Sequence, residues 1–342
     1  MKQKMNGKNR ITQTEVARRA NVSQAMVSYV LNDTATVSMP VETRQRILQA
    51  MDELGYVPNR AARSLRTNKT YTIAAIIPDI TNPFYPAFGR GIQDVAEQQD
   101  YDLIMYNTDG IAEKERKSLL SVQQGWVDGV ITVLFHLTAK DLIPLLETGL
   151  PVVRLEPSPK KIGTYPLDNL YVDNITAAQT VVSYLISQGH TQIGVIAAQS
   201  GPGQFRVQGY QQALAKHNLP LKQALIRYGD FSEEGGYEGM QALLSLSPRP
   251  TAIFAVNDLI AIGAVTAIQE AGFQIPTDIA VVGFDDIPTA KSLHPPLTTV
   301  TQYQERLGRR AAEMLFERLN GSVPEIGRCE EMPHGLIKRK SA

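Results

Sequence analysis

The chain has 342 residues, of which 43 % are hydrophobic and 20 % charged, so it can bury the cores of two or three globular domains. Its single cysteine, Cys329, excludes an internal disulfide framework, and no apolar run is long enough for a signal peptide or a membrane helix, so we expect a cytoplasmic protein. The net charge is zero, but residues 1–70 carry 12 Lys and Arg against 5 Asp and Glu, whereas the remainder carries 22 against 29. Residues 1–70 thus form a basic head and the remainder an acidic body, which predicts that only the head binds a polyanion.

The basic head opens with two short predicted helices. Thr12 and Glu15 form the capping-box pattern of a helix that ends at Ala20, and after a tight turn Ser23 can cap a second helix. Two such helices are typical of a helix-turn-helix, whose second helix enters the major groove of DNA. The outward face of this second helix is small and hydrogen-bonding rather than charged, and consists of Gln24, Ala25, Ser28 and Tyr29.

A third helix is predicted over residues 41–54, between Pro40 and Gly55. Its expected buried stripe is Val41, Ile47, Leu48, Met51 and Leu54. The segment that follows, 58–70, is basic and too short to be a stable helix alone in water, but two copies of it could pair on DNA. A three-helix domain without a ligand remains the alternative at this point.

From Tyr71 onward, short runs rich in Ile and Val alternate with amphipathic segments. The predicted strands are YTIAAIIP, YDLIMYN, DGVITVL, LPVVRLE, TQIGVIAA, TAIFAVN and DIAVVGFD, and we expect CEEMPHGLIK to be a final strand in the C-terminal lobe. Such alternation predicts parallel sheets covered by helices. About 270 residues exceed one compact sheet core, so we expect two lobes with a cleft at the carboxyl ends of the strands.

The body has no sequence fingerprint of a cofactor or of catalysis. The patterns GxGxxG, GxxxxGK[ST] and GxSxG are absent from the sequence, and its five histidines and one cysteine form no metal-ligand cluster. The glycine-rich stretch SGPGQF (Ser200–Phe205) lacks the lysine of a phosphate-binding loop and is interpreted as a loop of the cleft. We therefore expect no cofactor, no metal and no enzymatic activity.

Polar and aromatic residues collect where the predicted strands end, which is where a cleft would be lined. They are Asn82, Phe84, Tyr85, Glu156, Arg206, Phe231, Asn257 and Asp285, with Asp258 and Asp286 beside them. Carboxylates, amides and an arginine around aromatic rings suit a polyhydroxyl ligand, because hydroxyls both donate and accept while ring faces cover C–H surface. For each single residue a helix cap or a turn is the alternative, and Asp258 is expected to be an N-cap.

Longer stretches resemble the LacI/GalR family of bacterial transcription regulators. In the head these are TEVARRANVSQAMVSYVLN, VETRQRI and LGYVPNRAARSL, and in the body QFRVQGY, GDFS, FAVND, VGFDD and PPLTTVTQ, in order. The resemblance implies an all-α helix-turn-helix domain and a two-lobed α/β effector domain of the periplasmic-binding-protein-like type I fold. The expected divisions are a disordered basic tail over 1–9, the helix-turn-helix over 10–57, a hinge helix and linker over 58–70, an N-lobe at about 71–168 and 301–327, and a C-lobe at about 169–300 and 328–342.

The resemblance also implies contact residues. Expected DNA contacts are Gln24, Ala25 and Tyr29 with bases in the major groove, Thr12, Ser23, Ser28, Asn32, Ser38 and Thr43 with phosphates, and the hinge residues Asn59, Ala62 and Leu65 in the minor groove. The matched effector positions are Arg206, Phe231, Asn257, Asp285 and Gln302. Three residues depart from the family pattern: Tyr29 stands where many relatives have arginine, and Glu156 and Pro157 replace the more usual aspartate and arginine.

The implied protein is a homodimeric regulator of transcription, most simply a repressor, that binds a pseudo-palindromic operator under the control of a sugar or sugar derivative between its lobes. The residues after Gly321 have no leucine heptads, so we expect a dimer of about 75 kDa, twice 37.7 kDa, rather than a tetramer. Two alternatives share the architecture. A solute-binding protein would need export, and a sugar-modifying enzyme would need catalytic groups.

Overall fold

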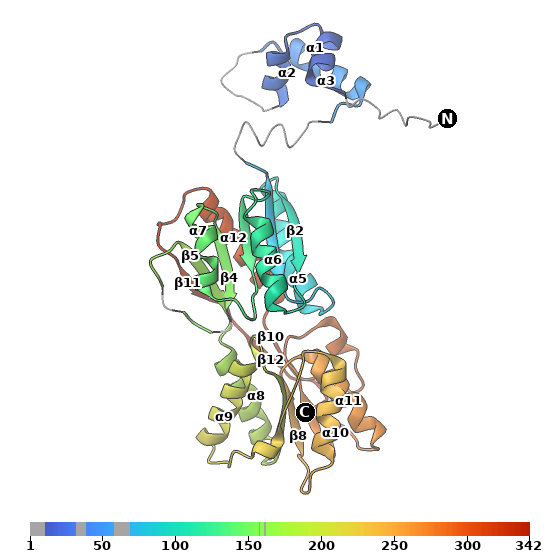
Figure 1. Ribbon diagram of the computed structural model, residues 1–342. Helices are drawn as coiled ribbons and strands as arrows, with labels where there is room; N and C mark the ends of the chain where they lie inside the picture. The colour runs from blue at the N-terminus through green and yellow to red at the C-terminus, as the bar shows by residue number, and fades with distance from the viewer. Residues whose placement is uncertain (1–10, 32–38, 58–68, 157, 161) are drawn as a thin grey trace, which may run out of the picture. The chain divides into compact units, whose positions relative to one another are not determined.

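The computed structural model describes residues 11–31, 39–57, 69–156, 158–160 and 162–342 (Figure 1). Several expected DNA contacts lie outside the described residues: Asn32, Ser38, Asn59, Ala62 and Leu65. The same holds for the expected basic tail over 1–9 and for Pro157. The chain divides into two compact units, Met1–Thr70 and Tyr71–Ala342.

The described residues of the first unit form three helices that pack around a small apolar core. The helices are α1 (Gln13–Ala20), α2 (Gln24–Leu31) and α3 (Val41–Leu54). Its buried residues are Val16, Ala17, Ala20, Val27, Val30, Ile47 and Ala50. Two residues that we expected in this core, Val41 and Leu48, are exposed. Ile47 and Ala50 lie three positions apart and define the buried face of α3; Leu48 is turned about 100° away from Ile47, and Val41 lies in the first turn.

The N-lobe of the second unit is a parallel sheet of six strands in the order β11-β5-β4-β3-β1-β2. Its strands are β1 (Thr72–Ile77), β2 (Asp102–Asn107), β3 (Gly129–Thr132), β4 (Val152–Glu156), β5 (Leu167–Tyr171) and β11 (Cys329–Glu331). Its helices are α5 (Phe84–Gln98), α6 (Ala112–Val122), the 3₁₀ helix η1 (Ala139–Leu142), α7 (Ile143–Glu147) and α12 (Gln304–Leu319). One apolar cluster includes residues of α5 and α12 and another includes residues of α6 and α7, so the sheet is covered on both faces.

The C-lobe has a parallel sheet in the order β7-β6-β8-β9 and an antiparallel pair, β10-β12. Its strands are β6 (Ile193–Ala198), β7 (Ile226–Gly229), β8 (Ala252–Ala255), β9 (Ala280–Val282), β10 (Thr299–Thr301) and β12 (Gly335–Ile337). Its helices are α8 (Asn174–Ser187), α9 (Gly203–Lys216), η2 (Gln223–Leu225), α10 (Glu233–Leu244), α11 (Asp258–Glu270) and η3 (Pro288–Lys291). Figure 1 shows β10 and β12 where the two lobes meet.

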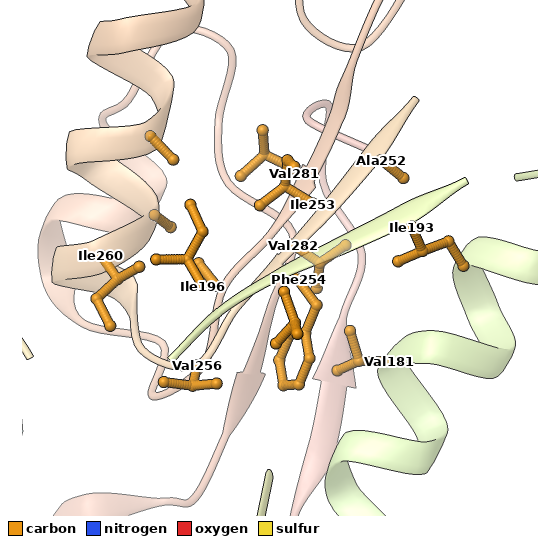
Figure 2. Close-up of a cluster of buried hydrophobic side chains, with 14 of the residues drawn as sticks. Val181, Ile193, Ile196, Ala252, Ile253, Phe254, Val256, Ile260, Val281 and Val282 are labelled. Atoms are coloured by element: carbon orange, nitrogen blue, oxygen red, sulfur yellow. The ribbon is translucent and has the colours of Figure 1, made fainter. Parts of the chain in front are cut away.

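The C-lobe encloses a single large apolar cluster that includes residues of β6, β8 and β9 and of the helices beside them. Figure 2 shows Val181 and Ile260, from helices α8 and α11, on either side of the strand residues Phe254 and Val282. All four side chains are fully buried. Truncating a ring in such a position to alanine costs about 3–5 kcal/mol, so this cluster gives the lobe a rigid base for the side chains at its strand ends.

The end of the chain differs from our expectation of one strand in the C-lobe. Cys329–Glu331 pairs with β5 in the N-lobe sheet, whereas Gly335–Ile337 pairs with β10 in the C-lobe. The expected lobe boundaries at 168/169 and 327/328 are wrong for the same reason, because β5 continues to Tyr171 and β11 lies beside it. Within the described residues, the chain therefore passes between the lobes three times, after β5, after β10 and after β11.

Candidate functional site

The outward face of α2 is the candidate DNA-reading surface. Gln24, Ala25 and Tyr29 are exposed, the tyrosine by 40 %, while Val27 and Val30 of the same helix are buried against α1 and α3. This burial fixes the orientation of α2, so its three outward side chains project together from a rigid helix. The arrangement suits base reading, which needs side chains held at fixed positions.

Three of the expected phosphate contacts in the described part of the head stand at helix starts, and the fourth, Ser28, lies in the middle of α2. Thr12 caps α1 in a complete capping box with Glu15, and the Ser23 hydroxyl accepts a hydrogen bond from the N–H of Met26 at 3.3 Å. Thr43 lies in the first turn of α3 and is half-buried, as is Ser28 on α2. Helix N-termini present N–H groups and a partial positive charge, which suits phosphate oxygens. An ion pair between Arg19 and Glu53 joins α1 to α3.

A pocket with a volume of about 410 Å³ lies where strand ends of the two lobes face each other. All nine expected effector residues line it, namely Asn82, Phe84, Tyr85, Glu156, Arg206, Phe231, Asn257, Asp285 and Gln302. The glycine-rich loop after β6 also lines it, as its sequence indicated. The volume falls in the range of small-molecule pockets, and the mixture of rings, amides and charges fits a polar ligand with apolar faces.

Arg206, on α9, is fixed in the C-lobe wall of the pocket. Its guanidinium donates to Asn174 Oδ1 at 2.7 Å and to the carbonyl of Val256, and it stacks on Phe284 at 3.6 Å from the ring centre. Nη2 lies 3.7 Å from the carboxylate of Asp285, a looser contact than its other hydrogen bonds. Burial lowers the pKa of Arg206 from its ordinary value, although Asp285 acts in the opposite direction. The buried guanidinium thus keeps one weakly paired nitrogen, Nη2, beside the pocket.

Asp285 faces Arg206 from the loop after β9 and has an unusual backbone. Its φ of 116° is a conformation that non-glycine residues rarely adopt, which marks a strained position. Gln302 donates to Asp285 Oδ1 at 2.7 Å, and Gln304 donates to its backbone carbonyl. Burial raises the pKa of Asp285 to about 6, while Arg206 and Gln302 oppose the shift. The pocket therefore holds a carboxylate and a guanidinium side by side, a pair that can accept from and donate to neighbouring hydroxyls.

Asp258 is not the N-cap that we expected. The N-cap of α11 is Asn257, whose side chain accepts from the N–H of Ile260 at 2.8 Å. Asp258 is the first residue of the helix and is fully buried, where it accepts from Ile287 N–H at 2.9 Å and contacts the Thr299 hydroxyl at 2.6 Å. Burial, and next the charge of Asp285, raises its pKa well above the ordinary value. Asp258 therefore ties α11 to the loop that carries Asp285.

The N-lobe wall begins at the carboxyl end of β1. Asn82 accepts from the N–H of Phe84 at 3.0 Å and so fixes the start of α5. Phe84 and Tyr85 follow, with ring centres 5.0 Å apart and an edge-to-face angle of 75°. Burial raises the pKa of Tyr85, so its hydroxyl stays protonated and can donate. This part of the wall offers the Tyr85 hydroxyl and apolar ring surface to a bound molecule.

Glu156 ends β4 in the N-lobe wall and has two cationic neighbours. Arg154 Nη1 lies 3.0 Å from Glu156 Oε1, and Lys160 Nζ lies 3.7 Å from Oε2. Burial raises the pKa of Glu156, while Arg154 and Lys160 oppose this. Arg154 also donates to the carbonyl of Leu137 at 2.7 Å. The sequence pattern missed Arg154 and Lys160, although a charged residue inside the apolar run LPVVRLE was a signal that this strand end faces something polar.

The expectations of no metal site and no membrane helix can be compared with the described residues. In the ranges that the structure covers, no group of three or more His, Cys, Asp and Glu is arranged to hold a metal ion. Over the same ranges, no helix combines the length and the apolar character that crossing a bilayer requires.

Known proteins resemble both units. Residues 12–59 match the model of the bacterial regulatory proteins of the lacI family, and residues 182–342 match that of the periplasmic binding protein-like domain. The chain is 34 % identical over 331 residues to the HTH-type transcriptional repressor PurR of Pasteurella multocida, covering 96 % of this chain and 97 % of that one. It is 33 % identical over 335 residues to the ribose operon repressor of Escherichia coli, covering 97 % and 99 %.

A solved structure agrees with this relationship. The Lac repressor dimer bound to operator and the anti-inducer ONPF superposes with a TM-score of 0.86 at 26 % identity, over 97 % of this chain and 99 % of that one. The relatives named above are repressors and not enzymes. A helix-turn-helix head, a two-lobed body and nearly full-length similarity to repressors lead to one conclusion. The chain belongs to the lacI family of bacterial regulatory proteins, which bind DNA and regulate transcription.

Proposed function

We propose that this protein is a repressor that binds a pseudo-palindromic operator as a homodimer and responds to a small molecule bound between its lobes. One observation carries the proposal: a helix whose exposed side chains suit base reading and a pocket lined by all nine expected effector residues occur in one chain. A repressor acts on chromosomal DNA, so the proposal places the protein in the bacterial cytoplasm.

The pocket supports a sugar or a sugar derivative as the effector. Arg206 and Asp285 offer a donor and an acceptor side by side, which suits adjacent hydroxyls. Phe84, Tyr85 and Phe231 offer ring faces for the C–H surface of a pyranose or furanose. The Escherichia coli relative is a ribose operon repressor, which agrees with this class.

The three passages between the lobes supply the mechanism. They act as a hinge, and a ligand that touches both walls favours one angle between the lobes. In a dimer, this angle sets the spacing of the two N-lobes and hence of the two reading helices. A coupling of about 1–3 kcal/mol then changes operator affinity roughly 5- to 150-fold.

Two measurements test the proposal. Selection from randomised DNA should return a pseudo-palindrome, and binding to it should weaken steeply as salt rises because phosphate contacts release counterions. A thermal-shift screen of sugars, sugar phosphates and nucleobases should find a compound that stabilises the body by mass action. Selected DNA without a two-fold repeat, or a protein that light scattering finds to be a monomer, would overturn the proposal.

A further inference from the structure

The segment Val133–Thr138, after β3, is held by a buried carboxylate that no sequence pattern indicated. Glu115, on α6, is fully buried and accepts from three consecutive backbone N–H groups, at 2.7 Å from Phe135, 3.2 Å from His136 and 2.9 Å from Leu137. Charge-assisted hydrogen bonds of this kind compensate the cost of burying a charge. Glu115 therefore fixes the backbone of this segment.

Two further contacts fix the same segment. The His136 ring Nε2 lies 2.7 Å from the carbonyl of Gly110, to which it must donate, and the carbonyl of Leu137 accepts from Arg154 at 2.7 Å. The segment lines the pocket along most of its length. Contacts with Glu115, Gly110 and Arg154 thus fix the backbone of the segment. This backbone sets the direction in which the Phe135 side chain points.

The Phe135 ring reaches from the N-lobe to the C-lobe. Its centre lies 5.6 Å from that of Phe231, with the planes tilted by 46°. It also covers Gly201 in the glycine-rich loop after β6, because a Cβ at Gly201 would lie only 2.6 Å from the nearest ring atom. Gly201 has a φ of 54°, so the absence of a side chain serves both the backbone and the ring. We call the contact of Phe135 with Gly201 and Phe231 the cross-lobe contact.

We propose that Phe135 is a closure-determining residue of the effector site and that Glu115 is its positioning residue: the ring, seated on Gly201 and Phe231, holds the lobes together at the rim of the pocket. The inference rests on the proposed function and deepens its regulation. The cross-lobe contact must break when the lobes separate, because Phe135 belongs to the N-lobe and Gly201 and Phe231 belong to the C-lobe. The contact therefore favours the closed arrangement of the lobes, and the SGPGQF loop provides the surface on which the Phe135 ring packs.

The test measures lobe separation directly, without DNA or effector. The full-length chain carries Cys329→Ser and spin labels at two exposed positions, introduced as Lys140→Cys beyond the Val133–Thr138 segment and Gln208→Cys on α9. The labelled chain is mixed with an excess of unlabelled chain, so that double electron–electron resonance reports the distance between the lobes of one protomer. Phe135→Ala and Gly201→Ala should each shift the distribution to longer and broader distances. The first removes the ring, and the second places a methyl group where the ring packs.

Matched variants separate this effect from general damage. Gly321→Ala places the same substitution at a similar φ of 68°, where a Cβ would have no described atom within 4 Å, and should leave the distances at wild type. Phe135→Ala combined with Gly201→Ala should match Phe135→Ala alone, because without the ring the new methyl group meets no clash. Glu115→Gln keeps the size of the side chain but loses an acceptor, and should shift the distances in the same direction. If Phe135→Ala unfolds, Phe135→Leu replaces it.

The outcomes are distinct. Wild-type distances in both Phe135→Ala and Gly201→Ala would overturn the closure role, and wild-type distances in Glu115→Gln would overturn the positioning role. If the distances move, operator affinity in the same variants should change by about threefold or more, and unchanged affinity would overturn the regulatory part. If the wild-type protein binds no specific operator, the proposed function fails, but the distance measurement still decides whether the contact closes the lobes.

Discussion

The Arg206 guanidinium lies face-on to the Phe284 ring, 3.6 Å from its centre, and two of its nitrogens are held by Asn174 and Val256. A planar, stacked cation has little freedom to turn, so its third nitrogen, Nη2, stays directed toward Asp285 and the pocket. Lysine has neither the plane nor the fork of donors and cannot reproduce this arrangement.

Arg206→Lys should therefore weaken binding of the effector found by thermal shift by about tenfold or more, which corresponds to about 1.4 kcal/mol. Operator binding without the effector should persist, because the head is untouched. Arg249→Lys is the matched control, since Arg249 also stacks on a ring, Phe273 at 4.1 Å, but is exposed and outside the pocket. Equal affinity for wild type and Arg206→Lys in calorimetry would remove Arg206 from the site.

The buried pair Asp258 and Asp285 predicts an unusual dependence of stability on pH. Both pKa values are raised by burial, that of Asp285 to about 6, so the folded state binds more protons than the unfolded chain above about pH 4. Their contribution to the free energy of unfolding is complete below the unfolded pKa and is lost as pH rises through the folded values. The loss is about 1.4 kcal/mol for each pH unit that separates the folded pKa from the unfolded pKa.

Asp258→Asn should remove much of this loss, because the amide resembles the protonated carboxyl and can still accept from Ile287. Denaturant unfolding of both proteins from about pH 4 to above pH 6 should show wild type losing stability relative to the variant as pH rises. Asp278→Asn, at an exposed aspartate of the same lobe, should follow wild type. Parallel curves for wild type and Asp258→Asn would show that Asp258 is ionised in the folded protein.

Asp168 should behave in the opposite way. It is fully buried in β5 and pairs with Arg318 at 2.5 Å and Arg328 at 2.8 Å. Burial alone would raise the pKa of Asp168, but the hydrogen bonds from both arginines outweigh it and lower the pKa. The stabilisation is thus present above about pH 4 and is lost as pH falls through the lowered value.

Asp168→Asn should destabilise the body by about 3 kcal/mol near neutral pH, because it leaves two arginines without their common partner. The difference should shrink on acidification. Glu113→Gln, which removes the exposed pair with Arg116 at 3.6 Å, should cost less than about 1 kcal/mol. The two costs are compared by chemical denaturation, and similar values would show that the Asp168 cluster adds nothing beyond a surface pair.

Much of the fold followed from local patterns. The runs YTIAAIIP and TQIGVIAA are β1 and β6, because apolar runs of this length between turns pack as buried strands of a parallel sheet. Local patterns did not show to which lobe each strand belongs. Cys329–Glu331 and Gly335–Ile337 are adjacent in sequence, but they pair with β5 and β10, and such long-range pairing leaves no mark in a local window.

The pocket was predictable where residue type and strand ends coincide, as at Asp285 and Asn82. It was not predictable where a role depends on tertiary partners. Asn257 and Asp258 are both residue types that cap helices. Only the positions of Thr299 and Ile287 show that Asp258 is instead a buried hydrogen-bond acceptor. The sequence carries no local signal for the role of Glu115, because the N–H groups that it binds are about 20 residues away.

Tyr29 tests the reading surface of the head. It is exposed on the outward face of α2 with Gln24 and Ala25, where we expect it to contact a base in the major groove. Tyr29→Arg should change the preferred base at one position of each half-site, with a discrimination of about 1–3 kcal/mol. Selection from randomised half-sites that returns the same consensus for both proteins would show that Tyr29 does not face the bases.

Leu65 lies outside the described residues, and its expected role is tested through DNA. Leu65→Ala should weaken binding to the selected operator far more than binding to random DNA, because only the bent specific complex uses an apolar wedge. Equal losses on both DNAs in a titration would remove Leu65 from that role.

The most direct test of the whole account is an operator titration, by fluorescence anisotropy, with and without the compound that stabilises the body. We predict that saturation with this compound changes the operator dissociation constant of wild type by roughly 5- to 150-fold, and that Arg206→Lys needs about ten times more of the compound to reach the same change. A compound that stabilises the body through this pocket while operator affinity stays constant would contradict the central claim that the pocket controls the DNA-reading head.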